Sequence, residues 1–314
     1  MSGKECDNSE TEGLMNRREF IRTTAFASLA AALGGCRSYD CAGRKLAVNA
    51  STIRGYGLAL KEQVKAAVAA GVRGYEPWLR DVHAAKASGA FADAVKMARD
   101  GGLSFVNGIA FGQWAHPDGT IRAAGLEETK RDMAALAEMG CPCIAASMFG
   151  VHKPGSPILT VEEIAERYAS VLELGSRMGV RPLLEYWGHS VNMNRLEDAL
   201  AVLARVGKDE AVLADVYHTY RGGGSFATFR RLRPDQLPVL HVNDYPLTKP
   251  RTALVDADRV WPGDGAAPWG DIWNAFDAAG LDPWLSTEVF NPSYWRTDAV
   301  DTLKTALAKM KGLA

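Results

Sequence analysis

Short apolar runs alternate with helix-like segments eight times between residues 46 and 310, and this alternation constrains the fold more than any other feature. The runs are apolar throughout rather than at every second position, which is typical of parallel strands buried on both faces. We predict strands at residues 46–50, 72–78, 103–109, 143–148, 181–186, 211–215, 238–244 and 284–289. We predict helices at residues 58–70, 91–99, 126–139, 161–178, 195–206, 226–232, 269–279 and 298–310.

Eight strand–helix pairs match the architecture of a (β/α)8 barrel, or TIM barrel, which typically takes about 250 residues. Glycines follow six of the predicted helices, where a left-handed residue lets the chain turn. They are Gly71, Gly102, Gly140, Gly179, Gly207 and Gly280. An open doubly wound sheet uses the same elements, but no Gly-x-Gly-x-x-Gly follows the first strand. We therefore predict a single α/β domain, a TIM barrel, over residues 42–314.

Four consecutive predicted strands carry metal-binding side chains at or near their carboxyl ends. These are Glu185, Asp215, His241 and Glu288, on strands five to eight. In a barrel these strand ends face the same side, where the active site forms. A single strand-end carboxylate often caps the next helix instead, but four such residues on neighbouring strands favour one site. Three carboxylates and an imidazole are a ligand set for one divalent cation.

The charge balance argues against nucleic acid as a partner. The net charge is −1, and no block of lysine or arginine forms a basic stripe. The five cysteines, at positions 6, 36, 41, 141 and 143, have neither zinc-site spacing nor the pattern of a disulfide framework. We interpret Cys141 and Cys143 as core residues of a strand.

Residues 1–41 have the features of an export signal and a short linker. The pair Arg17-Arg18 precedes an apolar run at residues 24–33, which is shorter than the roughly 20 residues of a membrane-spanning helix. The arginine pair, followed by Phe and Ile, resembles a twin-arginine signal. We therefore expect the twin-arginine export machinery as a partner and a periplasmic location. An ordinary amphipathic helix is the alternative.

A lipid anchor is a further expectation at this end of the chain. Leu33-Gly-Gly-Cys36 resembles a bacterial lipoprotein box, in which Cys36 is lipidated after cleavage. The acidic first residues do not fit a positively charged signal start, so the start of translation is open between Met1 and Met15.

The strand-end residues and their neighbours resemble the xylose isomerase-like TIM barrel superfamily, also called the sugar phosphate isomerase/epimerase family. The resemblance covers residues 46–313 and rests on Glu185, Asp215-x-x-His218, His241-Val-Asn-Asp244 and Leu285-Ser-Thr-Glu288-Val. Gly263-Asp-Gly265 resembles the Gly-x-Gly turn that follows strand seven in this family. Ketose 3-epimerases and inosose dehydratases belong to it, so the resemblance implies both the barrel and enzymatic activity.

In ketose 3-epimerases, the positions that match Glu185, Asp215, His241 and Glu288 bind one divalent metal, often manganese. The resemblance therefore implies one Mn²⁺ ion here, with Mg²⁺, Co²⁺ and Zn²⁺ as alternatives. It also implies that Glu185 and Glu288 form an acid/base pair and that His218 holds sugar oxygens. The chemistry agrees, because a metal bound to a carbonyl and its neighbouring hydroxyl stabilises the enediolate while two facing carboxylates move the proton.

The chain departs from the ketose 3-epimerase pattern in two places. Those enzymes carry a second glutamate after the strand-five ligand and an arginine after the strand-seven histidine. Here His189 is the candidate replacement for the first, and Lys249 or Arg251 for the second. Simple ketose epimerisation is therefore open, whereas metal-assisted chemistry on a sugar-like polyol is expected. One divalent charge against three carboxylates leaves the site negative, which suits a neutral polyol better than a phosphate.

Other residues are expected to contact the substrate. Trp114 and Trp187 follow predicted strands, and aromatic faces are good platforms for sugar rings, although such residues can also simply cover the barrel mouth. Glu76 and Asn107 lie on strands two and three, where they can reach hydroxyl groups. Asp244 at the end of strand seven completes the predicted substrate-binding set.

The function that we expect is a metal-dependent isomerase or epimerase acting on a sugar or cyclitol. One alternative keeps the metal and eliminates a leaving group, as an inosose dehydratase or a lyase of 3-keto-glycosides does. A second is a non-catalytic sugar-binding lipoprotein, against which the opposed pair Glu185 and Glu288 argues. A DNA-repair site of the endonuclease IV type needs more strand-end histidines than a chain with six in all provides. Tyr294-Trp295 either walls the pocket or contacts a second copy in a homo-oligomer.

Overall fold

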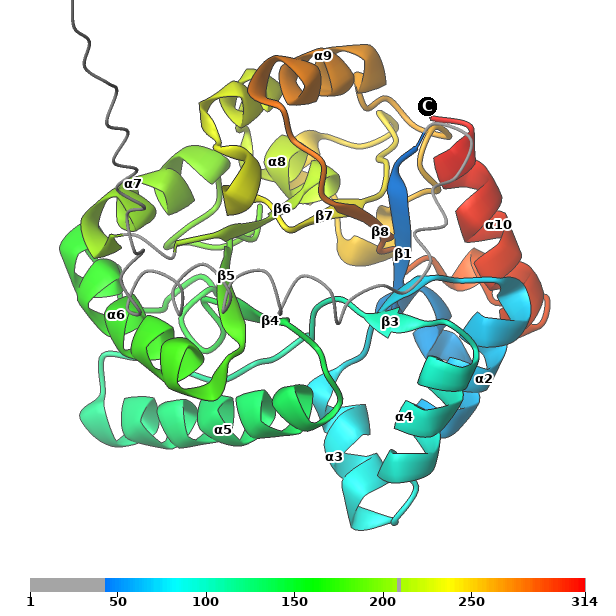
Figure 1. Cartoon of the computed structure of the whole chain (residues 1–314). Coiled ribbons are helices and arrows are strands. Elements are labelled where there is room, and N and C mark those ends of the chain that lie inside the picture. Colours follow the sequence, from blue (N-terminus) through cyan, green and yellow to red (C-terminus); the bar gives the residue numbers. More distant parts are fainter. Residues whose placement is uncertain (1–42, 208–209, 314) are drawn as a thin grey trace, which may run out of the picture. The chain divides into compact units, whose positions relative to one another are not determined.

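Eight parallel strands form the centre of the barrel, and helices surround them (Figure 1). The structure is a computed structural model that describes residues 43–207 and 210–313. The strands are β1 (Lys45–Asn49), β2 (Gly74–Glu76), β3 (Ser104–Phe105), β4 (Cys143–Ser147), β5 (Arg181–Glu185), β6 (Val212–Asp215), β7 (Val239–Val242) and β8 (Trp284–Thr287).

The strands are hydrogen-bonded in the order β3-β2-β1-β8-β7-β6-β5-β4. Just after β3, Gly108 forms a parallel bridge with Ile144 of β4 and so joins the two end strands. The Gly108 amide donates to the Cys143 carbonyl at 3.0 Å, and the Ala145 amide donates to the Gly108 carbonyl at 2.9 Å. The predicted TIM barrel is thus confirmed. Strand β3 is shorter than predicted because its second half pairs only through single bridges.

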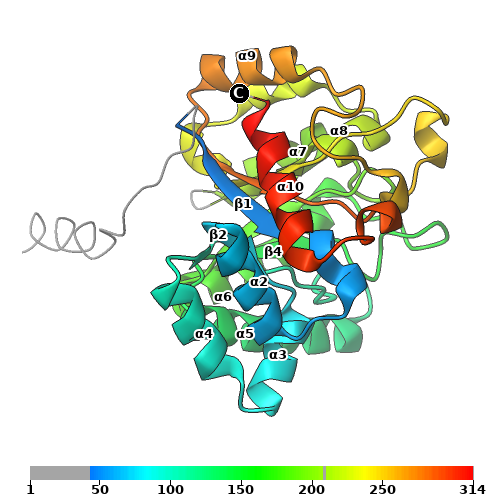
Figure 2. The ribbon, with the colours of Figure 1, turned by 90° about the vertical axis from the view of Figure 1, so that its right-hand side faces the viewer.

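Nine α-helices and six 3-10 helices accompany the strands in the described part of the chain. The first five longer elements are η1 (Ala50–Tyr56, a 3-10 helix), α2 (Leu60–Ala70), α3 (Leu79–Ala87), α4 (Phe91–Asp100) and α5 (Gly119–Glu138). They are followed by α6 (Val161–Met178), α7 (Leu196–Val206), α8 (Val216–Gly222), α9 (Trp269–Ala279) and α10 (Ala299–Lys311). The C-terminal helix α10 packs against α2 and β1 (Figure 2). The last unit of the barrel thus lies beside the first, where β8 pairs with β1.

The structure contains two helices that the sequence pattern does not predict, α3 and α8, and it starts α5 earlier. Helix α8 begins directly at the end of β6, inside the segment that we interpret as a strand-end motif. Helix α5 begins at Gly119, where the Asp118 carboxylate accepts hydrogen bonds from the amides of Thr120 and Ile121 at 2.8 and 3.0 Å. Its first turns are poor in apolar residues, so periodicity does not reveal them. The predicted helix at 226–232 is a 3-10 helix, η2 (Phe226–Arg231).

Several smaller predictions are confirmed or remain outside the described residues. All six glycines predicted at helix ends have positive φ, between 65° and 107°. Cys141 and Cys143 are buried free thiols as predicted, but only Cys143 belongs to a strand, because β4 begins there and Cys141 precedes it. The predicted export signal and Cys36 lie outside the residues that the structure describes. Within residues 43–207 and 210–313, no helix is long and apolar enough to cross a membrane.

Close contact between α5 and the loop after β3 depends on Gly125. A Cβ atom at Gly125 would lie 2.6–2.9 Å from backbone atoms of Gln113. In the loop itself, a Cβ at Gly112 would lie 2.4 Å from the hydroxyl of Thr129, a residue of α5. This loop also carries Phe111 to the barrel mouth, so the two glycines help to position a mouth residue.

We expect Gly125→Ala to lower the free energy of unfolding by about 1–3 kcal/mol, because the added methyl group must displace backbone atoms. Gly119→Ala is the matched control, since a Cβ at this position in the same helix meets only the Arg122 side chain, at 3.8 Å. The control should be neutral or stabilise by up to about 1 kcal/mol, because alanine favours the helix. Urea denaturation followed by circular dichroism measures both. Equal effects would show that the close contact is not needed.

Candidate metal centre and active site

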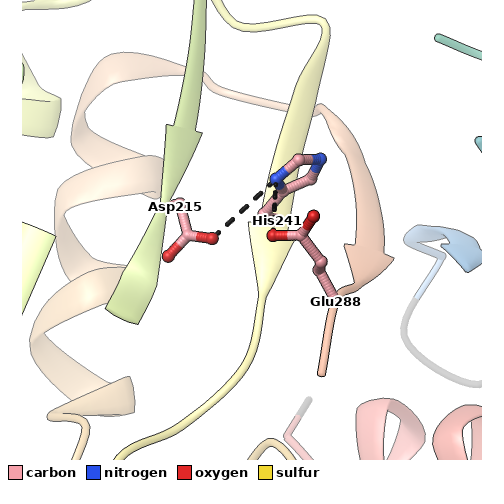
Figure 3. Close-up of side chains that lie close together, drawn as sticks. All are labelled: Asp215, His241 and Glu288. Atoms are coloured by element: carbon pink, nitrogen blue, oxygen red, sulfur yellow. Dashed lines mark ion pairs between the residues drawn. The ribbon is translucent and has the colours of Figure 1, made fainter. Parts of the chain in front are cut away.

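Three side chains from neighbouring strands converge at the carboxyl end of the barrel: Asp215 of β6, His241 of β7 and Glu288 just after β8 (Figure 3). One ligand atom from each lies within 4.8 Å of the others. His241 Nδ1 is 3.2 Å from Glu288 Oε2 and 3.8 Å from Asp215 Oδ2. Glu185 Oε1, at the end of β5, lies 4.0 Å from the same nitrogen. The structure therefore brings all four predicted ligands around one atom.

Asp215 has two roles, one for each carboxylate oxygen. Its Oδ1 accepts the amide of His218 at 2.7 Å and caps the N-terminus of α8. Its Oδ2 faces the cluster and accepts from Asn243 Nδ2 at 3.0 Å. Asp215 therefore caps a helix through Oδ1, as the alternative interpretation expects, and its Oδ2 is free to face the other candidate ligands. The side chain of Asn243 also donates to the Glu288 carbonyl at 3.2 Å and so ties the ends of β6 and β8 together.

Behind His241 lies a fourth carboxylate, in addition to the three candidate ligands. His241 Nε2 is 3.2 Å from Glu76 Oε2, which also accepts from Asn107 Nδ2 at 2.7 Å. A carboxylate on the far nitrogen of a ligating histidine fixes the ring and makes it a better ligand. The sequence pattern predicts that Glu76 and Asn107 reach substrate hydroxyls. In the structure Glu76 contacts His241 and Asn107 holds Glu76, so their main role is to orient the His241 ring. Each keeps one buried oxygen without a hydrogen-bond partner among the described residues.

Arg259 belongs to the cluster, and the sequence pattern does not reveal it. An antiparallel bridge between Asp244 and Val260 returns the long loop after β7 to the barrel mouth. The Arg259 side chain is buried there, and Nη1 donates to Asp215 Oδ2 at 2.9 Å and to Glu288 Oε2 at 2.8 Å. Asp256 Oδ1 accepts from Arg259 Nη2 at 2.7 Å and holds the guanidinium in place.

The two basic residues predicted to replace the epimerase arginine lie elsewhere. Lys249 pairs with Asp258 at 2.5 Å on the surface, and Arg251 donates to the Arg221 carbonyl at 2.7 Å. Neither reaches the cluster because the loop turns outward before it returns. Arg259 provides the buried positive charge instead.

Arg259 also determines the protonation of His218. Arg259 Nη2 lies 3.0 Å from His218 Nε2. Because a guanidinium only donates, His218 Nε2 must accept, and the proton of the neutral ring lies on Nδ1. Burial and the nearby arginine lower the pKa of His218 well below its usual range, which agrees with a neutral ring. His218 Nδ1 is buried and has no hydrogen-bond partner in the described structure, so it is a free donor beside the cluster.

The two glutamates of the expected acid/base pair have opposite pKa shifts before any metal binds. Burial raises the pKa of Glu185 to about 8. Burial also disfavours ionised Glu288, but the charges of His241 and Arg259 outweigh it and lower the pKa to about 2. Burial opposes the imidazolium of His241, yet Glu288 and Glu76 raise its pKa well above the usual range. At neutral pH, Glu288 is therefore a carboxylate while Glu185 is protonated.

The residues present fit a divalent cation. The donor set contains three carboxylates and one imidazole, which suit manganese, magnesium or zinc. His241 Nδ1 is fully buried and points at the carboxylates, with Glu288 Oε2 at 3.2 Å as the nearest of the three candidate carboxylate ligands. Metal binding must displace the proton that this nitrogen otherwise carries, so affinity should increase with pH.

A closed circle of aromatic and arginine side chains surrounds the barrel mouth, with at least one member from the loop after each strand. In order around the circle its members are Arg54, Trp78, Phe111, Phe149, His152, Trp187, His189, His218, Arg259 and Phe290. Neighbouring rings have centroids 5.0–5.7 Å apart. Trp187 and His189 lie in this circle, which places both of these predicted residues at the mouth.

Two predicted substrate contacts are placed differently. Trp114 is buried against Tyr168 of α6, with ring centroids 5.4 Å apart, so it packs between barrel and helix. Asp244 is fully buried, and its carboxylate accepts from the amides of Tyr245, Gly263 and Ala267 and from the Trp269 indole. Side chains alternate along a strand, so His241 and Asn243 face inward while Asp244 faces the outer loop. Alternation therefore points to Asn243 rather than Asp244.

We expect Glu185 to make the metal-free protein less stable as pH rises from about 5 to about 8. The folded chain keeps a proton on Glu185 in this range that the unfolded chain releases, so the free energy of unfolding falls by up to about 1.4 kcal/mol per pH unit. Glu185→Gln removes this loss, and the variant should gain stability relative to the parent between pH 5 and 8. Urea denaturation in the presence of EDTA measures the difference, and a pH-independent difference would contradict the shift.

Comparison with known proteins agrees with this fold. Residues 64–312 match the family described as xylose isomerase-like TIM barrel. Among curated proteins, the inosose isomerase of Bacillus velezensis is 31% identical over 151 residues, which cover 46% of this chain and 54% of that protein. The chain thus spans about half the length of the curated relatives it matches.

Solved structures share the fold at low sequence identity. The crystal structure of the IOLI protein with a bound zinc atom has a TM-score of 0.78 at 19% identity, covering 86% of this chain and 97% of that chain. A protein described as the probable 3-DHS dehydratase AsbF from Bacillus anthracis has a TM-score of 0.69 at 16% identity, covering 85% and 98%. L-ribulose 3-epimerase has a TM-score of 0.65 at 18% identity, covering 86% and 94%. By its family match and its eight-stranded barrel, this chain belongs to the xylose isomerase-like TIM barrel family.

Proposed function

We propose that the protein is a metal-dependent isomerase or epimerase that moves a proton between carbon atoms of a sugar or cyclitol. The observation that carries the proposal is the convergence of Glu185, Asp215 and Glu288 on the Nδ1 atom of His241. The curated relatives named inosose isomerase support a cyclitol-like substrate. The zinc atom in the similar IOLI structure supports a divalent metal, and which metal this chain uses is part of the proposal.

Glu288 and Glu185 are the proton-transferring groups in this proposal. A divalent cation held by Glu185, Asp215, His241 and Glu288 would polarise the carbonyl of the substrate and acidify the neighbouring C–H. Glu288 would remove a proton from carbon and Glu185 would return one, as in the acid/base pair that the family resemblance implies. Two carboxyl groups beside one metal site provide the base and the acid that a proton transfer needs.

His218 and Arg259 complete the site. The free Nδ1–H of His218 can donate to a substrate oxygen on which negative charge develops. Arg259 keeps the other ring nitrogen occupied and holds Glu288 in its ionised form. These roles depend on geometry that the protein has before a substrate binds, so little reorganisation is needed.

Elimination is the second candidate outcome for the same site. If the substrate carries a leaving group β to the acidified carbon, loss of the proton leads to loss of that group. The structure of AsbF supports this candidate, because a protein described as a probable dehydratase has the same barrel fold. The ketone needed for proton removal is common to both outcomes, and only the product separates them.

We expect the manganese-loaded protein to exchange carbon-bound hydrogen of an inosose for deuterium in heavy water, and the metal-stripped protein to lose this activity. Glu288→Gln should lower the exchange rate at least about 100-fold, since general base catalysis typically contributes about 10²–10⁴-fold. Glu173→Gln is the matched control, because Glu173 lies on the surface of α6 and pairs with Arg177. Proton NMR, recorded after removal of manganese, measures the exchange.

The product separates the candidates in the same experiment. Deuterium at carbon in an intact skeleton supports an isomerase or epimerase. Loss of water from an inosose, or of the aglycone from a 3-keto-glycoside, supports the elimination. A metal-loaded protein that binds these compounds and exchanges nothing would contradict both and favour a sugar-binding protein.

We expect Glu76→Gln to weaken metal binding by about 10–100-fold, because the neutral amide no longer fixes and polarises His241. The variant keeps the size of the side chain, so the barrel should remain folded. Competition with a fluorescent chelator for zinc measures the affinity, with Glu173→Gln as the control. An unchanged zinc affinity would show that His241 does not need its carboxylate partner.

A further inference from the structure

A cavity opens at the barrel mouth between the loops that follow β1 and β2. Its volume is about 150 Å³, and its lining includes Arg54, Gln63, Trp78, Arg80 and Asp81. This volume is below the usual range of sites that enclose a whole small ligand, about 300–1,000 Å³, and suits a single substituent of a ligand. None of the four candidate metal ligands lines it, so the cavity is distinct from the metal centre.

The charges in this cavity are unbalanced. The guanidinium carbons of Arg54 and Arg80 lie 5.1 and 4.3 Å from the ring of Trp78. Asp81 accompanies Arg80 at 3.4 Å, and its other oxygen accepts from Gln63 Nε2 at 3.0 Å. In the described residues, no carboxylate forms an ion pair with Arg54. The lining of the cavity thus carries two cations and one anion, and Asp256, which pairs with Arg259, is a further carboxylate whose charge acts on Arg54.

Trp78 joins this cavity to the metal centre. Its indole Nε1 donates to the Ser51 hydroxyl at 3.0 Å, and the same hydroxyl lies 3.4 Å from Glu288 Oε1. Arg54 also contacts the ring of Phe290, which follows Glu288 by two positions, at 5.5 Å. Trp78 and Ser51 therefore connect the cavity to the base of the proposed reaction.

We propose that this cavity binds a carboxylate group of the substrate, so that the protein acts on an acidic sugar or cyclitol derivative. The planar guanidinium groups match a carboxylate in shape, and a lining with two cations and one anion suits a monoanion better than a phosphate dianion. This substrate class depends on the proposed function, whereas binding of the carboxylate does not.

A cation–π role alone is the competing explanation, because arginines often stack on exposed tryptophans for about 0.5–1 kcal/mol. The chain offers a matched control for it. Arg44 lies 4.2 Å from the ring of Trp273, just before β1 and thus at the opposite end of the barrel from the cavity. Arg44→Gln removes an arginine–indole contact of the same kind without touching the cavity.

The test uses D-glucuronate as the probe and D-glucose as its neutral counterpart, which differ only in the carboxylate. The indole N–H signals of the zinc-loaded protein are followed by heteronuclear NMR during each titration, and Trp78→Phe identifies the Trp78 signal. We expect glucuronate to shift the Trp78 signal and to bind about tenfold or more tightly than glucose. Arg54→Gln and Arg80→Gln should each weaken glucuronate binding by about tenfold, and Arg44→Gln should not.

Each outcome decides the proposal. Equal binding of the two sugars, no binding of glucuronate, or unchanged binding in both Arg54→Gln and Arg80→Gln overturns it. Because all of these variants lie outside the metal ligands, unchanged zinc affinity serves as the check that they are folded. Glucuronate binding without deuterium exchange supports the cavity and counts against the reaction, whereas exchange without glucuronate binding supports the reaction alone and overturns the cavity.

Discussion

Buried negative charge at the carboxyl end of the barrel is the constraint on which the rest of the site depends. Glu185, Asp215 and Glu288 are all buried, and carboxylates in a protein interior are stable only when cations or hydrogen-bond donors compensate them. The chain provides two such cations, His241 and Arg259, within about hydrogen-bonding distance of the same oxygens. The raised pKa of Glu185 shows that this compensation is incomplete, because one carboxyl group keeps its proton.

Arg259 changes the electrostatic argument that the sequence alone supports. One divalent ion against three carboxylates leaves a negative site, which favours a neutral substrate. The guanidinium of Arg259 adds a buried positive charge beside Asp215 and Glu288, while Glu76 beside His241 and Asp256 beside Arg259 add negative charge. The arginines beside Trp78 place further positive charge at the barrel mouth, away from the metal centre. The position of positive charge in the tertiary structure, rather than its amount in the sequence, therefore determines which substrates suit the mouth.

Sequence periodicity predicts the barrel and its four candidate ligands well, for a physical reason. Strands buried on both faces must be apolar along their whole length, so a polar residue at the end of such a run marks the place where the strand leaves the core. Glu185 and Asp215 are found in this way. Alternation along β7 also identifies Asn243, whereas the choice of Asp244 follows the motif and not the strand geometry. Helix α3 is missed because the stronger amphipathic pattern of α4 comes soon after it.

The sequence by itself determined the fold class, the number of βα units and the residues that end four neighbouring strands, because these depend on local hydrophobic patterns. Only the tertiary structure decided that Arg259 returns to the cluster, that Glu76 lies behind His241 and that the mouth residues form one circle. Those contacts join residues far apart in the chain through loops whose paths depend on packing, such as the bridge between Asp244 and Val260. Local pattern carries no information about where such a loop comes back, because the contact energy that decides it appears only when the barrel is formed.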